Sequence, residues 1–131
     1  MLFLTSFLCI MNFFIVAYVP TILIVELKGA AKDIHSSTGG IYILRSNQVN
    51  SKAHWIQDGG LNALWYDKDH GDWSIGDIGN LGSATVKIYS PDNSVGPLEA
   101  TIWKYANNGE FIETTNLIIL SVPGIFHIVL Q

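Results

Sequence analysis

The most polar stretch of the sequence is the hexapeptide Asp67-Lys-Asp-His-Gly-Asp72, which places three carboxylates within six residues. Carboxylate oxygens are the hard ligands that Ca²⁺ prefers, so Asp67, Asp69 and Asp72 are the candidate metal ligands. Their spacing departs from the D-x-D-x-D-G pattern of an EF-hand, and no later Glu is placed to close such a loop. Asp and Gly also favour turns for conformational reasons, so a solvated hairpin turn is the competing interpretation.

Aromatic side chains provide a second candidate site, at Tyr66, Tyr89, Trp103 and Tyr105. In the expected strands, each of these rings lies on the face opposite a more aliphatic set of residues. A contiguous exposed patch of such rings would bind a sugar or a peptide, whereas rings inside a core that is apolar on both faces would serve stability alone. We therefore predict a ligand-binding surface at these four residues, with burial of the rings as the alternative.

No catalytic apparatus is recognisable. The nucleophile elbow G-x-S-x-G is absent, and the single cysteine, Cys9, lies inside an apolar run near the N-terminus. Asp72 and Asp77 lie close in sequence, but nothing around them supports a pair of glycosidase carboxylates. The histidines lack the spacing of a zinc site; they are His35, His54, His70 and His127. We predict a protein that is not an enzyme and that uses no cofactor.

Short apolar and aromatic runs separated by turn residues occupy residues 41–115 and predict an antiparallel sheet. Asp58-Gly-Gly60 and Asn107-Asn-Gly109 indicate tight hairpins, because these residues accept positive φ angles. Several runs are apolar on both faces, and four tryptophans can fill a small core. The predicted fold class is all-β, a small antiparallel meander closing as a barrel or tight sandwich. The strands are expected at 41–44, 53–57, 61–66, 73–76, 84–89, 98–105 and 111–115.

The two ends of the chain are apolar. Residues 1–25 carry no charged side chain and, as a helix, would span about 37 Å, enough to cross a hydrocarbon core of about 30 Å. We predict an N-terminal hydrophobic helix in the segment 1–31, either a signal peptide cleaved before Lys32 or an uncleaved signal anchor; a wrongly assigned start is the alternative. Residues 32–40 are polar and rich in Gly and Ser, which predicts a linker. Residues 116–131 are either a strand pair around a Pro-Gly turn or a truncated tail.

The charge balance is mildly acidic, with 7 Lys and Arg against 11 Asp and Glu, a net charge of −4. The basic residues are scattered, so the clustered footprint that neutralises phosphates is missing and nucleic acid is not an expected partner. The N-terminal segment instead predicts contact with the membrane. We expect a secreted or membrane-anchored protein with an extracellular β domain whose partner is a glycan or a protein.

Six short motifs follow one another in the middle of the chain. They are V-N-x-K-x-x-W from Val49, D-G at Asp58, A-x-W-Y-D from Ala63, W-x-I-G from Trp73, L-G-S from Leu81 and W-x-Y from Trp103. This order resembles a short tryptophan-rich β module that recurs, often in several copies, in large secreted or receptor-like proteins of invertebrates and protists. The resemblance covers about residues 41–113 and implies an extracellular β fold, without an established activity or ligand. Many copies have Gly where this chain has Ser51.

The function that follows from these observations is a non-catalytic extracellular module that binds a glycan or a protein. One alternative is a purely structural unit of a larger extracellular protein, of which this chain would be a fragment. Another is a Ca²⁺-binding β domain that uses the carboxylates between Asp67 and Asp72.

Overall fold

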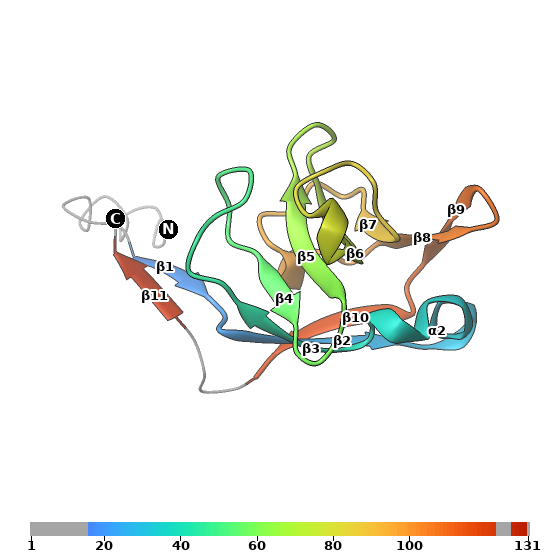
Figure 1. Ribbon diagram of the computed structural model, residues 1–131, viewed down its shortest axis with the longest axis horizontal. Coiled ribbons are helices and arrows are strands. Elements are labelled where there is room, and N and C mark those ends of the chain that lie inside the picture. Colours follow the sequence, from blue (N-terminus) through green and yellow to red (C-terminus); the bar gives the residue numbers. More distant parts are fainter. Residues whose placement is uncertain (1–15, 123–126, 131) are drawn as a thin grey trace, which may run out of the picture.

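The computed structural model describes residues 16–122 and 127–130, and most of them belong to a nine-stranded antiparallel sheet that curls nearly into a barrel (Figure 1). The strand order is β10-β2-β3-β4-β5-β6-β7-β8-β9. The prediction of an all-β antiparallel meander is confirmed. The strands are β2 (Ile22–Leu27), β3 (Gly40–Leu44), β4 (Trp55–Gln57), β5 (Asn62–Asp67), β6 (Asp72–Asp77), β7 (Ile88–Ser90), β8 (Trp103–Asn107), β9 (Glu110–Thr114) and β10 (Leu117–Ser121).

Two further strands form a separate ribbon at the left of Figure 1. There β1 (Val16–Val19) pairs antiparallel with β11 (His127–Leu130). Among the described residues, no helix is both long and apolar enough to cross a membrane. The helices are short: α2 (Gly29–His35) and the 3-10 turns η1 (Ser36–Thr38), η2 (Ile78–Asn80) and η3 (Pro97–Glu99).

Large side chains from alternating strand positions fill the core of the barrel. Trp55, Trp73 and Trp103 are at most 3% exposed and lie together with buried aliphatic residues of β2, β6, β7 and β10. Tyr42 is also buried, and its hydroxyl donates to the Thr38 carbonyl at 2.6 Å. Burial raises the pKa of Tyr42 well above that of a free tyrosine. The prediction that tryptophan supplies much of the core is confirmed.

The fourth tryptophan, Trp65, is buried on the outside of the barrel, where the loop after β6 covers it. Its indole N–H donates to the Ser83 carbonyl at 3.1 Å. Gly76 makes this packing possible, because a Cβ there would lie 3.0 Å from the Trp65 ring and 3.3 Å from the Val86 Cα. The strand predicted at 84–89 is therefore shorter, and β7 begins only at Ile88 because the preceding residues belong to this cover.

The end of the apolar N-terminal segment forms β2, which is one of the strands of the barrel sheet. β2 lies between β3 and β10, and its alternation buries Leu23 and Val25 completely while Ile24 faces outward. The helix predicted over 1–31 is thus replaced at 22–27 by a strand, which suits this run of β-branched residues once partners on both sides satisfy its backbone. Residues 1–15 of that predicted helix lie outside the described residues.

The predicted linker and the first strand of the predicted tail also join the barrel, whereas the second strand of the tail belongs to the separate ribbon. The linker expected at 32–40 is instead the end of α2, then η1 and the first residue of β3. Thr38 is buried there, and the His35 ring nitrogen lies 2.6 Å from the Ala106 carbonyl. In the tail expected at 116–131, both strands form, but β10 pairs with β2 and β11 pairs with β1. Each strand of the tail thus pairs with an N-terminal strand rather than with the other; residues 123–126 and 131 are outside the described part.

Leu23→Ala should lower the free energy of unfolding of the full chain by about 2–5 kcal/mol, because it opens a cavity in the core. Ile24→Ala, on the outer face of the same strand, should cost less than about 1.5 kcal/mol, since only part of its side chain is buried. Urea unfolding followed by tryptophan fluorescence measures both values. If β2 is removed with a cleaved signal peptide, the two mature proteins would be equally stable, which would contradict a structural role for this strand.

The loop between β3 and β4 turns at Asn50 and Ser51, whose φ angles are 53° and 65°. A serine in this left-handed region is strained, whereas glycine is not, so Ser51→Gly should raise the free energy of unfolding by about 0.5–1 kcal/mol after its greater unfolded-state entropy is counted. Ser46→Gly is the matched control, because Ser46 is exposed in the same loop without a positive φ. Urea midpoints that shift equally in both variants would rule out relief of strain.

Candidate functional site

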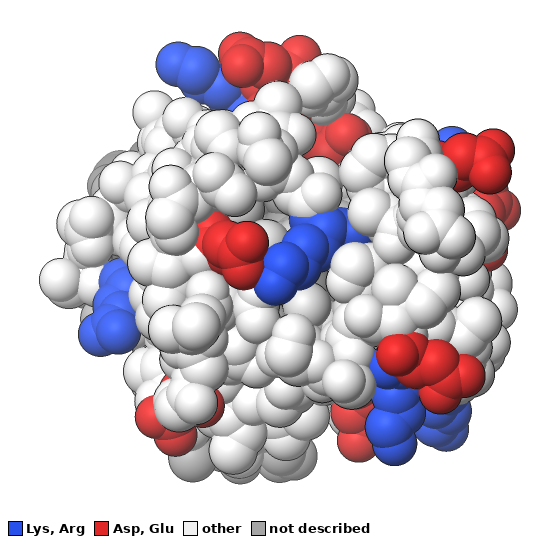
Figure 2. Space-filling view, turned by 45° about the vertical axis from the view of Figure 1, so that its right-hand side comes forward, with Lys and Arg blue, Asp and Glu red and all other residues white. Residues whose placement is uncertain are grey.

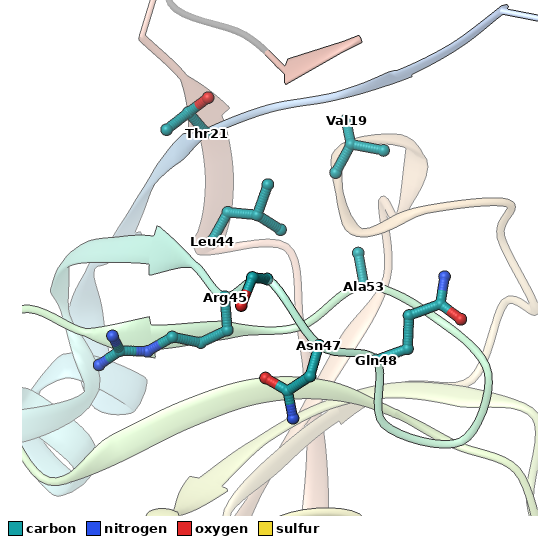
Figure 3. Close-up of a pocket in the computed structure, with 8 residues that line it drawn as sticks. Val19, Thr21, Leu44, Arg45, Asn47, Gln48 and Ala53 are labelled. Carbon is teal, nitrogen blue, oxygen red and sulfur yellow. The ribbon is translucent and has the colours of Figure 1, made fainter. Parts of the chain in front are cut away.

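Two adjoining cavities open at one end of the barrel, where β2, β4 and β6 begin and β3 ends. The larger has a volume of about 760 Å³ and the smaller, drawn in Figure 3, about 340 Å³. They share Val19 and Ala53 in their lining, so we treat them together and call them the barrel-mouth cleft. The lining of the larger cavity is completed by Pro20, Lys52, Trp55, Trp73, Val95, Gly96, Pro97, Leu98 and Glu99.

Trp55 and Trp73 form the floor of the cleft and meet edge to face, with ring centroids 6.1 Å apart. The Trp55 indole N–H donates to the Pro20 carbonyl at 2.8 Å, and the Trp73 N–H donates to the Ser94 carbonyl at 3.1 Å. Each tryptophan therefore anchors one rim of the cleft. Because both polar N–H groups are satisfied by the rims, the small part of each ring that is exposed offers a ligand only apolar surface.

The rim formed by residues 91–97 is fixed by the Asp92 carboxylate. Its Oδ1 accepts a hydrogen bond from the Ser90 hydroxyl at 2.7 Å, and its Oδ2 accepts from the Thr101 backbone N–H at 2.8 Å. Burial by itself would raise the pKa of Asp92, but these hydrogen bonds, with those from Ile102 and the Thr101 hydroxyl, lower it. The rim thus stays in place while Val95, 87% exposed, projects from it.

The smaller cavity is apolar at its centre and polar at its edge. In Figure 3 the side chains of Val19, Leu44 and Ala53 converge, while those of Arg45 and Asn47 point away from them. On the side of the larger cavity, the Lys52 ammonium lies 5.0 Å from the centroid of the Tyr66 ring. Such a cleft can enclose an apolar group and contact polar atoms around it.

The four aromatic residues predicted as a binding surface do not come together on one exposed patch. Trp103 is fully buried, Tyr105 is 5% exposed, and Tyr66 is half-buried with its ring 5.5 Å from that of Trp73. Tyr89 alone lies on the outer face, where it contacts Phe111. The inward faces of β5 and β8 carry Tyr66, Trp103 and Tyr105, which belong to the core or pack against it.

The three predicted metal ligands lie where β5 turns into β6: Asp67 ends β5, Asp69 is in the turn and Asp72 begins β6. Asp67 is buried, and its Oδ1 accepts the Asp69 backbone N–H at 3.0 Å while its Oδ2 lies 2.7 Å from His70 Nδ1. The hydrogen bond with Asp67 raises the pKa of His70, and burial raises the pKa of Asp72. Within the described part of the chain, no group of three or more His, Cys, Asp or Glu side chains is arranged to hold a metal ion. Asp67 thus serves the turn, as in the competing interpretation.

Sequence reasoning missed the residues that build the cleft. Trp55 and Trp73 carried no signal beyond their size, and the rim residues Pro97 and Leu98 were assigned to a loop and a strand. In the structure Trp55 begins β4 and Trp73 is the second residue of β6, and strand starts at the same barrel end converge in space, but the strand expected at 53–57 placed Trp55 in its middle. On the face shown in Figure 2, acidic and basic side chains lie scattered or in small mixed groups between broad uncharged areas.

Comparisons of this chain with protein-family models, with curated protein sequences and with solved structures found no match. The resemblance to a tryptophan-rich β module therefore stays a prediction from the motifs, and the geometry of the cleft carries the functional argument.

Asp92→Ala should lower the free energy of unfolding by about 1–3 kcal/mol near neutral pH, because it removes the acceptor of several hydrogen bonds to the rim. Asp33→Ala, at an exposed carboxylate of α2, is the control and should change stability by less than about 0.5 kcal/mol. Since the folded-state pKa of Asp92 is lowered, its contribution is present above the ordinary Asp pKa and is lost as the pH falls through the lowered value. Urea unfolding at neutral and acid pH should show the difference shrinking in acid; equal stability of both variants would contradict this role.

Proposed function

We propose that this chain is a non-catalytic binding module whose barrel-mouth cleft receives a bulky apolar group of a protein partner. The observation that supports this proposal is the cavity of about 760 Å³ floored by Trp55 and Trp73. Binding pockets for small ligands typically measure about 300–1,000 Å³, are mainly apolar and aromatic, and occur at the mouths of β-barrels. The extracellular location predicted from the N-terminal segment belongs to the same proposal.

A peptide side chain suits this cleft better than a glycan does. Sugar recognition combines ring stacking with several hydrogen bonds to hydroxyl groups, whereas both indole N–H groups here are already bonded to the rims. The polar groups of the larger cavity, Lys52 and Glu99, stand beside the apolar floor and suit contact with a peptide backbone or a charged neighbour. The exposed Val95 on the rim would add apolar contact area outside the cavity.

A structural role in a larger assembly is the second candidate, and a different surface favours it. The outer face of β10, β2 and β3 aligns Leu120, Ile24 and Ile41 across the sheet. Leu120 is 44% and Ile41 is 45% exposed, and Ile118 on β10 is 43% exposed. Aliphatic side chains exposed together in this way are typical of surfaces that another polypeptide covers.

Ala53→Trp tests the cleft, because Ala53 lines both cavities and a larger side chain would fill the space between them. The neutral apolar fluorophore N-phenyl-1-naphthylamine should bind the full chain with increased fluorescence, and Ala53→Trp should weaken that binding about tenfold or more. Ala30→Trp places the same side chain at an exposed position of α2 and should leave the affinity unchanged. Circular dichroism confirms that both variants fold. Equal affinities for the two variants would show that the cleft is not the binding site.

A further inference from the structure

A third cavity lies on the outer face of the barrel. Its volume is about 230 Å³, and because side chains alternate along β6, Ser74 faces it while Trp73 and Ile75 face the core. We call it the outer-face pocket. Its lining consists of Asp67, His70, Asp72, Ser74, Ala84, Val86, Tyr89 and Phe111.

Ser74 is the first sign that this pocket accepts a ligand. The residue is 1% exposed, and its hydroxyl oxygen has no hydrogen-bond partner among the described residues. A buried hydroxyl without a partner costs about 1–3 kcal/mol, and such groups in native structures call for an explanation. A donor on a bound molecule would satisfy it.

Asp72 supplies an acceptor on the same face of β6, two residues before Ser74. Its carboxylate receives no hydrogen bond from any described residue, whereas both oxygens of Asp67 are engaged by Asp69 and His70. Burial raises the pKa of Asp72; His70 opposes this, and the negative charges of Asp67 and Asp92 raise it further. No Lys or Arg is among the residues that line the pocket, and the one imidazole there, His70, is engaged by Asp67 rather than by Asp72. A bound cation would therefore relieve the repulsion between these carboxylates.

The remaining wall of the pocket is aromatic and aliphatic. The rings of Tyr89 and Phe111 meet edge to face with centroids 4.9 Å apart, and Ala84 and Val86 line the cavity beside them. Aromatic faces attract cations, and the aliphatic side chains suit an alkyl chain. Lys104, which lies opposite Tyr89 in the sheet register, is itself opposite Glu113 on β9 and is not among the residues that line the pocket.

From this arrangement we propose that the outer-face pocket binds a primary alkylammonium group. The ammonium would donate hydrogen bonds to the Asp72 carboxylate and to Ser74 Oγ, while its alkyl chain lies against Val86 and Phe111. A primary ammonium fits better than a quaternary one, because only a group with N–H donors satisfies the Ser74 hydroxyl. The site is separate from the barrel-mouth cleft and does not depend on the function proposed for it.

The test is a titration of the full chain with n-butylammonium chloride near neutral pH at constant ionic strength, followed by chemical shifts of the Tyr89 and Phe111 rings. Two matched probes are n-butanol, which lacks the charge, and tetramethylammonium chloride, which lacks N–H donors. We expect butylammonium to bind about tenfold or more tightly than either probe. Equal binding of n-butanol, or no binding of butylammonium, would overturn the proposal.

Three variants locate the site. Asp72→Asn should weaken butylammonium binding about tenfold or more, and Asp69→Asn, an exposed acid of the same turn outside the pocket lining, should change it less than about twofold. Ser74→Ala should weaken binding while leaving the chain at least as stable, because it removes an unsatisfied hydroxyl. Loss of stability without loss of affinity in Ser74→Ala would overturn the assignment. Nα-acetyl-lysine N-methylamide then distinguishes a lysine side chain from a free amine: it binds only if the pocket accepts the group on a peptide backbone.

Discussion

A buried indole N–H is stabilised by an acceptor, and three of the four tryptophans find one in the backbone of a loop, whereas the Trp103 N–H has no partner among the described residues. Trp55 bonds to Pro20, Trp65 to Ser83 and Trp73 to Ser94. Each ring thereby contributes apolar area to the packing and fixes a connecting segment to the barrel at the same time. The only cysteine is at position 9, so the β domain contains no disulfide. The indole hydrogen bonds therefore help to hold its loops against the barrel.

The same bonds determine where the molecule can bind other molecules. Trp55 and Trp73 lie at the barrel end, so anchoring Pro20 and Ser94 holds two rims apart above a shared aromatic floor. Asp92 then fixes the second rim from the solvent side through Thr101. Packing on the other side of β6 is different, because Trp65 and its loop cover only part of that face and leave Ser74 at the bottom of the outer-face pocket. One strand therefore separates an apolar cleft from a pocket that combines acidic groups with an aromatic and aliphatic wall.

The hairpins and most of the strands were predictable, because local residues determine them. Asn108 and Gly109 take the positive φ angles that their hairpin requires, and β8 and β9 pair around them. The face of each strand was harder to predict: Leu64 and Trp65 are both fully buried, one inside the barrel and one beneath a loop. The cleft was not predictable, since it depends on which loops the indole N–H groups reach, and that is decided by contacts between residues far apart in sequence.

The apolar N-terminal segment shows most clearly where sequence patterns become ambiguous. A strand that is apolar on both faces lacks the alternation of apolar and polar residues that identifies a strand in a sequence. The pattern of Ile22–Leu27 therefore predicts part of a membrane helix as readily as a strand. Its inner face, Leu23 and Val25, is explained by the core. Its outer face aligns with Leu120 and Ile41, which are exposed on this surface. At residues 22–25, the apolar run that suggested a membrane span from sequence contributes Leu23 and Val25 to the core and Ile22 and Ile24 to the opposite face of the sheet.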